Sequence, residues 1–441
     1  MPVARPIQAG LVLAFLVTTP AGMSERSGEM RGGDLNAIAE EYVKLVLAVG
    51  QHDPDYVDAY YGPPEWRPAK DAVPPPLGML RERSAALSKR LASAPAQEEM
   101  LLRREHLAKQ LGALDARLRF LGGERLTFDE ESRALYDAVA PVHPASHFDE
   151  ALAALDRRLP GTGPVPARYE RYRAQFVIPK DRLDRVFAAA IEGCRARTRA
   201  HVTLPADERF TLEYVTGKPW SGYNWYQGGS VSVIQINTDL PIYIDRAIDL
   251  ACHEGYPGHH VYNALLEEHL VRRRGWVEFT VYPLFSPQSL IAEGTANFGV
   301  DVAFPRSERA AFEREHLFPS AGLDASNAAA YHEVQMLVDR LKYADNEAAR
   351  GFLDGAWSRD EAIAWLQKYA LMRRDRAEQR VRFIERYRSY VINYNLGEDL
   401  VRAHVEARGG TADHPEKRWE EFVTLISSPR LPSGLSGASP R

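Results

Sequence analysis

The sequence is poor in cysteine, and this shortage excludes Cys-rich metal and redox sites. Its 441 residues contain two cysteines, Cys194 and Cys252, at no spacing typical of such motifs. The two could form one disulfide, but a chain of this size does not need one. Because Cys252 precedes His253 in a presumed helix, we expect it to point elsewhere, as a buried small apolar residue.

An excess of basic charge is also absent. Lys and Arg number 55 against 60 Asp and Glu, a net charge of -5 with a pI near 6.3. This balance gives no support for nucleic-acid or anionic-membrane partners. No fixed-period repeat is visible, which argues against a solenoid.

Long apolar runs are missing, apart from one short run near the N-terminus. Residues 7–17 are apolar, one arginine precedes them, and small residues follow at Thr19 and Ala21. That order is typical of a secretory signal peptide and is too short to span a bilayer. We predict a signal peptide over residues 1–25 and export to the periplasm or outside the cell. The alternative is a disordered start and a cytoplasmic protein.

Most of the chain shows helical periodicity. Apolar residues recur at helical spacing in residues 35–50, 97–121 and 181–200, and again beyond residue 290. The sequence predicts a mainly α, large two-lobed fold. We divide it into an N-terminal helical region (33–200), a catalytic region (205–428) and a disordered Pro/Gly/Ser-rich tail (429–441).

A small sheet interrupts the helices before residue 240. "FTLEYV" (210–215) and "SVSVIQINT" (230–238) alternate apolar and polar residues, so they predict short strands. Between them, "TGKPWSGYNWYQGG" predicts an aromatic loop, and "LPIYIDRAIDLACHE" then predicts a helix with Pro241 in its first turn. We expect a small antiparallel sheet beside this helix.

The stretch "HEGYPGHH" (253–260) departs from the zinc-protease signature His-Glu-x-x-His. In a regular helix, residues six or seven apart lie about 9–10.5 Å apart along the axis, so His253 could not share a metal with His259 or His260. Pro257 and Gly258, however, are residues that distort helices. A bulge or break there could bring His259 beside His253.

A zinc hydrolase needs a third protein ligand, and "LIAEGTANFG" offers Glu293. Asn297, one turn later on the same face, could orient a ligand histidine. Glu254 would polarise the water and transfer its proton to the leaving group. His201, His316 and His332 have no comparable setting.

These motifs resemble the domain-of-unknown-function 885 family of bacterial proteins, which is grouped with the gluzincin metallopeptidases. That family carries His-Glu-x-x-Pro-Gly-His-His and then Glu-Gly-Trp-Ala-x-Tyr. The resemblance covers roughly residues 205–400. It implies a mainly helical metallopeptidase-like fold whose small sheet edges the cleft, and zinc held by His253, His259 and Glu293, with Glu254 as the general base.

The resemblance extends more diffusely to "ERYRSYVINYNLGEDL", where it places the family's tyrosine at Tyr394 and its glycine at Gly397. Thr295 and Phe298 replace the family's Trp and Tyr, and its Asp-Thr-Gly-x-His element is missing. Tyr394 would donate a hydrogen bond to the developing oxyanion, with Tyr387 or His332 as less favoured donors.

Three residues are predicted to contact the substrate, namely His260, Asn237 and Tyr387. His260 is also the competing metal ligand, and Tyr387 could equally be a core aromatic residue. The aromatic loop and the strand after it could bind an extended peptide by main-chain pairing along a sheet edge, or could instead be a buried aromatic cluster.

The sequence therefore predicts a zinc-dependent hydrolase, most simply a peptidase acting on a peptide substrate. Two alternatives remain: a zinc amidase or esterase acting on non-peptide substrates, and an inactive metallopeptidase-like protein that binds peptides. A helical scaffold without metal is disfavoured because it leaves the Pro-Gly between histidines unexplained.

Overall fold

The computed structural model describes residues 22–95 and 97–435, with side chains from residue 34 onward. It is mainly helical with a small amount of strand, which confirms the predicted fold class. Residues 1–21 of the predicted signal peptide lie outside the described residues, and the first helix begins at Gly22. None of the described helices is long and apolar enough to cross a membrane.

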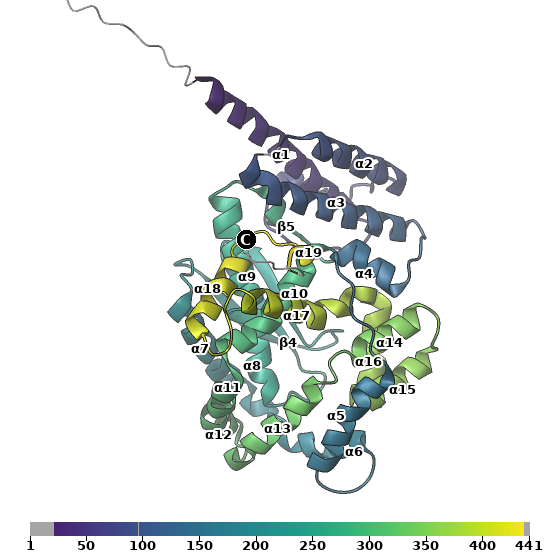
Figure 1. Ribbon diagram of the computed structural model, residues 1–441, viewed down its shortest axis with the longest axis vertical. Helices are drawn as coiled ribbons and strands as arrows, with labels where there is room; N and C mark the ends of the chain where they lie inside the picture. The colour runs from purple at the N-terminus through teal and green to yellow at the C-terminus, as the bar shows by residue number, and fades with distance from the viewer. Residues whose placement is uncertain (1–21, 96, 436–441) are drawn as a thin grey trace, which may run out of the picture.

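The helices that precede the main sheet begin with three that pack together at one end of the molecule, at the top of Figure 1. Short capping sequences mark the first residues of some of these helices. In α4, Thr127 and Glu130 form a reciprocal capping box, which satisfies free N–H groups of the first turn. The bounds of these helices are α1 Gly22–Val49, α2 Leu77–Ser93, α3 Leu101–Leu121, α4 Phe128–Tyr136, α5 Ala145–Arg158, α6 Val165–Arg173 and α7 Leu183–His201.

The main sheet has three strands in the order β2-β4-β3. β2 (Arg209–Val215) and β4 (Val231–Asn237) confirm the two predicted strands. The predicted aromatic loop is wrong, because β3 (Gly222–Gly228) lies within it and pairs antiparallel with β4. β2 pairs parallel with β4, so the sheet is mixed. Within β3, Asn224 and Tyr226 point inward and Trp225 points outward. The glycines of this segment made the alternation hard to recognise in the sequence.

A second sheet joins the two predicted regions of the chain. β1 (Val57–Tyr60) pairs antiparallel with β5 (Val281–Pro283). A single hydrophobic core runs from Leu35 in α1 to Leu435 at the C-terminal end. The N-terminal region is therefore packed into the same core as the predicted catalytic region.

Helices after the main sheet build the rest of the molecule. The predicted helix start at Pro241 is wrong, because Tyr243 bridges to Val177 and the helix begins only at Asp245. The bounds are α8 Asp245–Leu250, the π-helix η5 Ala251–Gly255, α9 His259–Leu266, α10 Pro287–Ala303, α11 Arg306–Phe312, α12 Phe318–Ala321, α13 Ala328–Asp339, α14 Ala344–Leu353, α15 Arg359–Tyr369, α16 Arg374–Tyr387, α17 Ile392–Glu406, α18 Pro415–Ile426 and α19 Pro432–Leu435.

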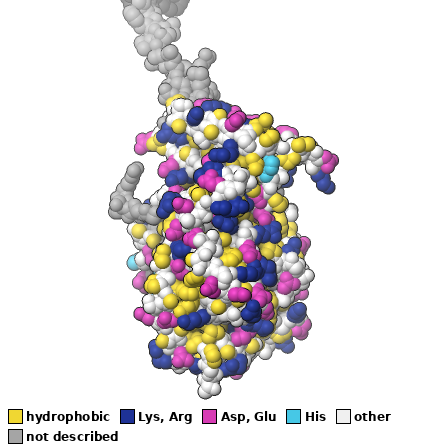
Figure 2. All heavy atoms as spheres, turned by 90° about the vertical axis from the view of Figure 1, so that its right-hand side faces the viewer, with side chains coloured by type: hydrophobic (Ala, Val, Ile, Leu, Met, Phe, Trp, Pro, Cys, Tyr) yellow, Lys and Arg dark blue, Asp and Glu magenta, His cyan; other side chains and the backbone are white. Residues whose placement is uncertain are grey.

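Two predictions about the chain's covalent and terminal structure need correction. Cys194 and Cys252 form a disulfide, so neither is a free apolar residue. The predicted disordered tail starts too early, because Leu431 and Leu435 are buried and α19 is ordered. On the face in Figure 2, basic and acidic side chains are interspersed and do not gather by sign.

Candidate metal centre

The metal-site prediction depended on a break in the helix, and the break is present. α8 continues into the π-helix η5, which carries His253 and ends at Gly255. The chain then leaves the helical conformation, the Tyr256–Pro257 peptide is cis, and α9 begins at His259. The Nε2 atoms of His253 and His259 consequently lie 3.1 Å apart.

Gly258 is the residue that allows this turn to close. Its N–H donates to the carbonyl oxygen of Cys252 at 2.9 Å. A Cβ on Gly258 would lie 1.9 Å from the carbonyl oxygen of His253 and 2.4 Å from that of Cys252. Both obstacles are backbone atoms, so no side-chain rotation could relieve the clash.

We expect Gly258→Ala to destabilise the fold by at least ~3 kcal/mol, the upper end of the cost of overpacking. The two histidines should also separate, because the turn between them must open. Urea denaturation measures the first effect. The control is Gly112→Ala, at an exposed position in α3 with open space around it, which should stabilise by up to ~1 kcal/mol. Equal behaviour of the two variants would contradict the assigned role of Gly258.

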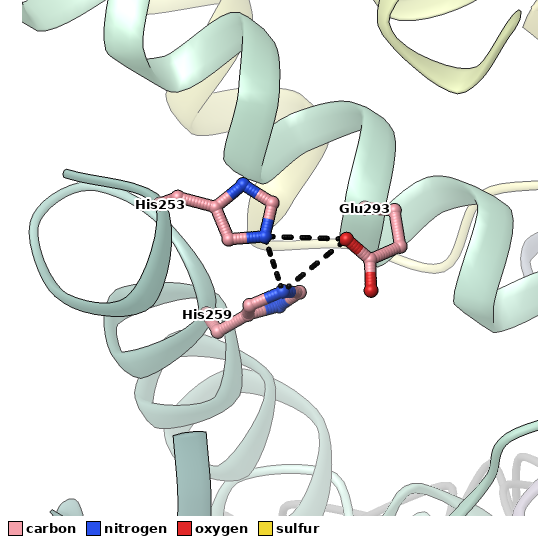
Figure 3. Close-up of side chains that lie close together, drawn as sticks. All are labelled: His253, His259 and Glu293. Carbon is pink, nitrogen blue, oxygen red and sulfur yellow. Dashed lines mark hydrogen bonds and ion pairs between the residues drawn. The ribbon is translucent and has the colours of Figure 1, made fainter. Parts of the chain in front are cut away.

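Glu293 completes a group of three side chains able to hold a metal ion, the three that the sequence indicated. It lies in α10, and its Oε2 atom is 3.2 Å from His253 Nε2 and 3.6 Å from His259 Nε2. Figure 3 shows the three side chains converging on one point. This is the one group of metal-ligating side chains found in the described part of the chain, and its ligand atoms lie within 4.8 Å of one another.

The geometry of these atoms fits a zinc ion. Zinc–nitrogen and zinc–oxygen bonds of about 2.0–2.1 Å in a tetrahedron give ligand-to-ligand distances of about 3.3 Å. The three observed distances, from 3.1 to 3.6 Å, bracket that value. In addition, Glu293 Oε2 is buried, and the polar atoms that face it are the Nε2 atoms of His253 and His259. A buried carboxylate is unfavourable without a positive partner, which a metal ion or the protonated histidines supply.

Outer residues orient the ligands. Asn297 Oδ1 accepts from His253 Nδ1 at 2.8 Å, which leaves Nε2 free for a metal and fits the predicted orienting role. The Asn297 amide donates to the carbonyl oxygen of Tyr394 at 2.7 Å. Tyr390, which sequence reasoning missed, donates from its hydroxyl to Glu293 Oε1 at 2.7 Å. Its position four residues before Tyr394 was the available signal.

A close helix crossing makes these contacts possible. α10 and α17 meet where a Cβ on Gly294 would lie 2.4 Å from the carbonyl carbon of Gly397. The two backbones therefore touch, which brings Tyr394 of α17 against Asn297, and Tyr390, in the short turn before α17, against Glu293. The family resemblance matched a glycine to Gly397. The close crossing of the two helices explains why this position has no side chain.

The charged side chains of the centre shift one another's pKa values. Burial alone would lower the pKa of His253, but the hydrogen bond to Glu293, together with the charges of Glu254 and Glu293, raises it to about 9. Burial opposes ionisation of Glu293 too, yet His259 and His253 hold its pKa well below the usual range. A metal ion must displace protons from these histidines, so its binding strengthens as pH rises.

Glu254, the predicted general base, lies beside these three side chains. It is buried, and its carbonyl oxygen accepts from Asn224 Nδ2 at 2.7 Å. A Cβ on Gly222 would lie 2.8 Å from Glu254 Oε1, so the missing side chain of β3 makes room for the carboxylate. Burial raises the pKa of Glu254, Glu293 adds to the rise, and His253 and His259 oppose it.

The two predicted tyrosines line the same region. Tyr394 packs edge-to-face on Tyr390, and its hydroxyl makes no hydrogen bond within the described residues. Burial and the charge of Glu293 raise its pKa, so the hydroxyl keeps its proton and can donate. Tyr387 lies on α16 between Phe383 and Tyr390 and is partly exposed.

His260 is not part of this centre, and its predicted roles as substrate contact or competing ligand are wrong. It is fully buried beneath the sheet, with Nδ1 2.9 Å from Ser232 Oγ and Nε2 3.0 Å from Glu208 Oε2. Because α9 begins at His259, the next side chain points about 100° away around the helix.

The buried pair of Glu208 and His260 predicts an acid-sensitive fold. Burial would raise the pKa of Glu208, but hydrogen bonds from His260, Tyr256 and Arg199 outweigh it and lower the pKa from 4.5 to about 2. A lowered pKa stabilises the fold fully above pH 4.5, and this contribution is lost as pH falls toward 2.

We therefore expect the free energy of unfolding to fall between pH 5 and pH 2.5, and to fall less steeply in Glu208→Gln. Denaturant titrations at several pH values measure the slope. Glu99→Gln, at an exposed glutamate without an ion pair, should keep the wild-type slope. If Glu208→Gln kept the wild-type slope, Glu208 would not be the source of the acid sensitivity.

Two further predicted residues act elsewhere. Asn237 donates to the carbonyl oxygens of Lys218 and Trp220, both at 2.9 Å, and accepts from the N–H of Asp239. It shapes the loop before β3, so the prediction of substrate contact is wrong. His332 pairs with Glu313 at 2.8 Å, away from the three ligands, and is not the oxyanion donor.

Sequence reasoning also missed an acidic residue from the N-terminal region. Asp58 of β1 accepts a hydrogen bond from the hydroxyl of Tyr223. Burial raises its pKa to about 8, and the charges of Glu293 and Glu254 contribute. Nothing in the sequence around Asp58 marks it, because only the pairing of β1 with β5 brings it to the centre.

The fold and the site define a mainly helical protein with a candidate two-histidine, one-glutamate metal centre. No protein-family profile and no curated protein matches the chain. Among solved structures it is similar to "the putative lipoprotein from Colwellia psychrerythraea", with 14% identity, a TM-score of 0.51 and coverage of 84% of this chain and 70% of that one.

A second similar structure is a "putative lipoprotein of unknown function" from Shewanella oneidensis. It has 13% identity and a TM-score of 0.40, over 80% of this chain and 72% of that one. At these identities, a likeness concerns the fold alone. The resemblance to the domain-of-unknown-function 885 family stays a prediction.

Proposed function

We propose that this protein is a zinc-dependent hydrolase that cleaves peptide bonds. The observation that carries the proposal is the convergence of His253, His259 and Glu293 on one point, with their ligand atoms at the distances that a tetrahedral metal ion requires. The adjacent buried carboxylate of Glu254, which is not one of these ligands, distinguishes a catalytic arrangement from a purely structural metal site.

A zinc ion held by these residues would polarise water and the substrate carbonyl. Glu254 accepts the proton of the attacking water and passes it to the leaving amine nitrogen. The Tyr394 hydroxyl, which keeps its proton, donates a hydrogen bond to the carbonyl oxygen as negative charge develops on it. Asn297 and Tyr390 hold His253 and Glu293 in place.

The sheet edge supports a peptide as substrate. β3 is an edge strand, and it adjoins Glu254 through Gly222 and Asn224. An extended peptide could pair with the main chain of such an edge. Tyr223 lies 4.6 Å from Trp225 and 5.3 Å from Trp220 by ring centroids, and this aromatic row offers contacts for apolar side chains.

Export fits the same proposal. The N-terminal sequence predicts a signal peptide, the similar structure from Colwellia psychrerythraea is described as a putative lipoprotein, and the Cys194–Cys252 disulfide suits an oxidising compartment. Sequencing the N-terminus of protein purified from its native host tests this part of the proposal.

The test of the metal centre is metal content by mass spectrometry. We expect about one zinc per chain in the wild type and loss of zinc in His253→Ala, His259→Ala and Glu293→Ala, because each change removes one of three ligands. His316→Ala, at an exposed histidine outside the site, is the control. A wild type that stays free of metal after zinc is supplied would defeat the proposal.

Hydrolysis is then measured on panels of peptides, amides and esters. Turnover confined to amides or esters that are not peptides would reassign the substrate. Zinc without turnover on any panel would instead support a peptide-binding protein that has lost catalysis.

A further inference from the structure

A guanidinium group without a carboxylate partner lies beside the proposed active site. Arg376 of α16 is partly buried, and it donates to Gln379 Oε1 at 2.6 Å and to Ser221 Oγ at 3.0 Å. Both acceptors are neutral. Arg376 forms no ion pair with any carboxylate of the described residues.

The surroundings of Arg376 are positive. Burial lowers its pKa to about 10, and Arg380, Arg246 and Arg173 contribute to the shift, with Asp345 opposing. Each of these three neighbouring arginines is already paired with a carboxylate: Asp345 at 2.7 Å, Asp249 at 3.1 Å and Glu170 at 2.9 Å respectively. Asp249 also pairs with Arg309, and Glu170 also pairs with Arg373, so these carboxylates are not available to Arg376.

Arg376 belongs to the face of α16 that borders the metal centre. Arg380, Phe383 and Tyr387 follow it at helical spacing and share that face. Phe383 lies 6.4 Å from Tyr394 by ring centroids, and Arg380 lies 5.8 Å from the same ring. One end of this face carries the unpaired guanidinium.

Ser221 and Gly222 relate the position of Arg376 to that of the proposed base. Ser221, which Arg376 contacts, directly precedes Gly222, where a Cβ would lie 2.8 Å from Glu254 Oε1. Neighbouring strand residues are about 3.3 Å apart, close to the advance per residue of an extended peptide. A group bound at Arg376 would lie one or two residues from the bond cleaved beside Glu254.

We propose that Arg376 binds the C-terminal carboxylate of the peptide substrate, so that cleavage releases one or two residues from the C-terminus. The planar guanidinium matches a carboxylate through two parallel N–H···O bonds. An uncharged amide at the chain end would leave Arg376 without a carboxylate partner. This inference rests on the proposed peptidase function for its substrate, but the site can be tested without turnover.

The experiment is calorimetric titration of the zinc-loaded full chain carrying Glu254→Gln, which prevents cleavage. The probes are acetyl-Ala-Ala-Ala as the free acid, its C-terminal amide, and acetyl-Ala-Glu-Ala amide, whose carboxylate is on a side chain. We expect the free acid to bind at least tenfold more tightly than either amide. The preference for the free acid should vanish in Arg376→Gln. It should be reduced in Arg376→Lys, which keeps the positive charge but lacks the two parallel N–H donors.

The matched control is Arg382→Gln on the same helix, an exposed arginine without an ion pair, which should keep the wild-type preference. Equal binding of acid and amide, or a preference that survives Arg376→Gln, would overturn the inference. Tight binding of the Glu-containing amide would overturn the C-terminal assignment. Hydrolysis by the protein that retains Glu254 is measured separately. A failure of the peptidase proposal can therefore be told apart from a failure of carboxylate binding at Arg376.

Discussion

Glu254→Gln should lower the rate of peptide hydrolysis by about 10²- to 10⁴-fold, the usual contribution of general acid–base catalysis. The amide is nearly the same size as the carboxylate, so it should fit the space beside Gly222, but it cannot accept a proton from water. Zinc content should stay near one per chain, because Glu254 is not one of the three ligands. Steady-state kinetics and mass spectrometry on the same preparation measure both.

The control for this prediction is Glu213→Gln, at an exposed glutamate on β2 that lies on the outer face of the sheet. It should hydrolyse peptides at the wild-type rate. A Glu254→Gln protein within tenfold of the wild type would remove Glu254 from the mechanism. Loss of zinc together with activity would mean that the variant disturbs the ligands, and Glu254 would then be a structural part of the centre.

Removing the Cys194–Cys252 disulfide should lower the free energy of unfolding by about 4 kcal/mol. The crosslink closes a loop with a sequence separation of 58 residues, and loop-closure entropy for that length gives about this value. It joins α7 to η5 one residue before His253, so the turn between His253 and His259 is tethered to a core helix. Urea denaturation of Cys194→Ala/Cys252→Ala beside the wild type measures the loss.

A reductant provides the internal control for the disulfide. It should shift the wild-type denaturation curve toward that of the double variant and leave the variant's curve unchanged. Each Cys→Ala change removes only one sulfur atom, and comparison with the reduced wild type separates the loss of the crosslink from the loss of this buried volume. A wild type whose stability changes by less than ~1 kcal/mol on reduction would show that the crosslink constrains the unfolded chain little.

Several features could be predicted because their causes are local. Helical periodicity specified most helices, and alternation specified β2 and β4. Pro257 and Gly258 indicated a break between two histidines, since one residue removes a backbone donor and the other lacks a Cβ. The spacing of "AEG" then pointed to Glu293, and one helical turn pointed to Asn297.

Other features could not be predicted because they depend on distant segments. β3 was hidden by its glycines, and only its pairing with β4 shows that they allow close approach to Glu254 and Tyr61. Cys194 and Cys252 gave no spacing signal, since a disulfide depends on two Cα atoms meeting in space, here 5.6 Å apart. The partner of His260, Glu208, comes from the segment before β2.

The sequence by itself therefore determined the helical class, the broken helix and the three side chains able to hold a metal. Those properties follow from periodicity, backbone freedom and ligand chemistry within short segments. Tertiary structure alone decided which side chains surround them. The crossing of α10 and α17 at Gly294 and Gly397 places Tyr390 on Glu293, β1 brings Asp58, and α16 brings Arg376. These positions follow from how helices and strands pack, which no local pattern encodes.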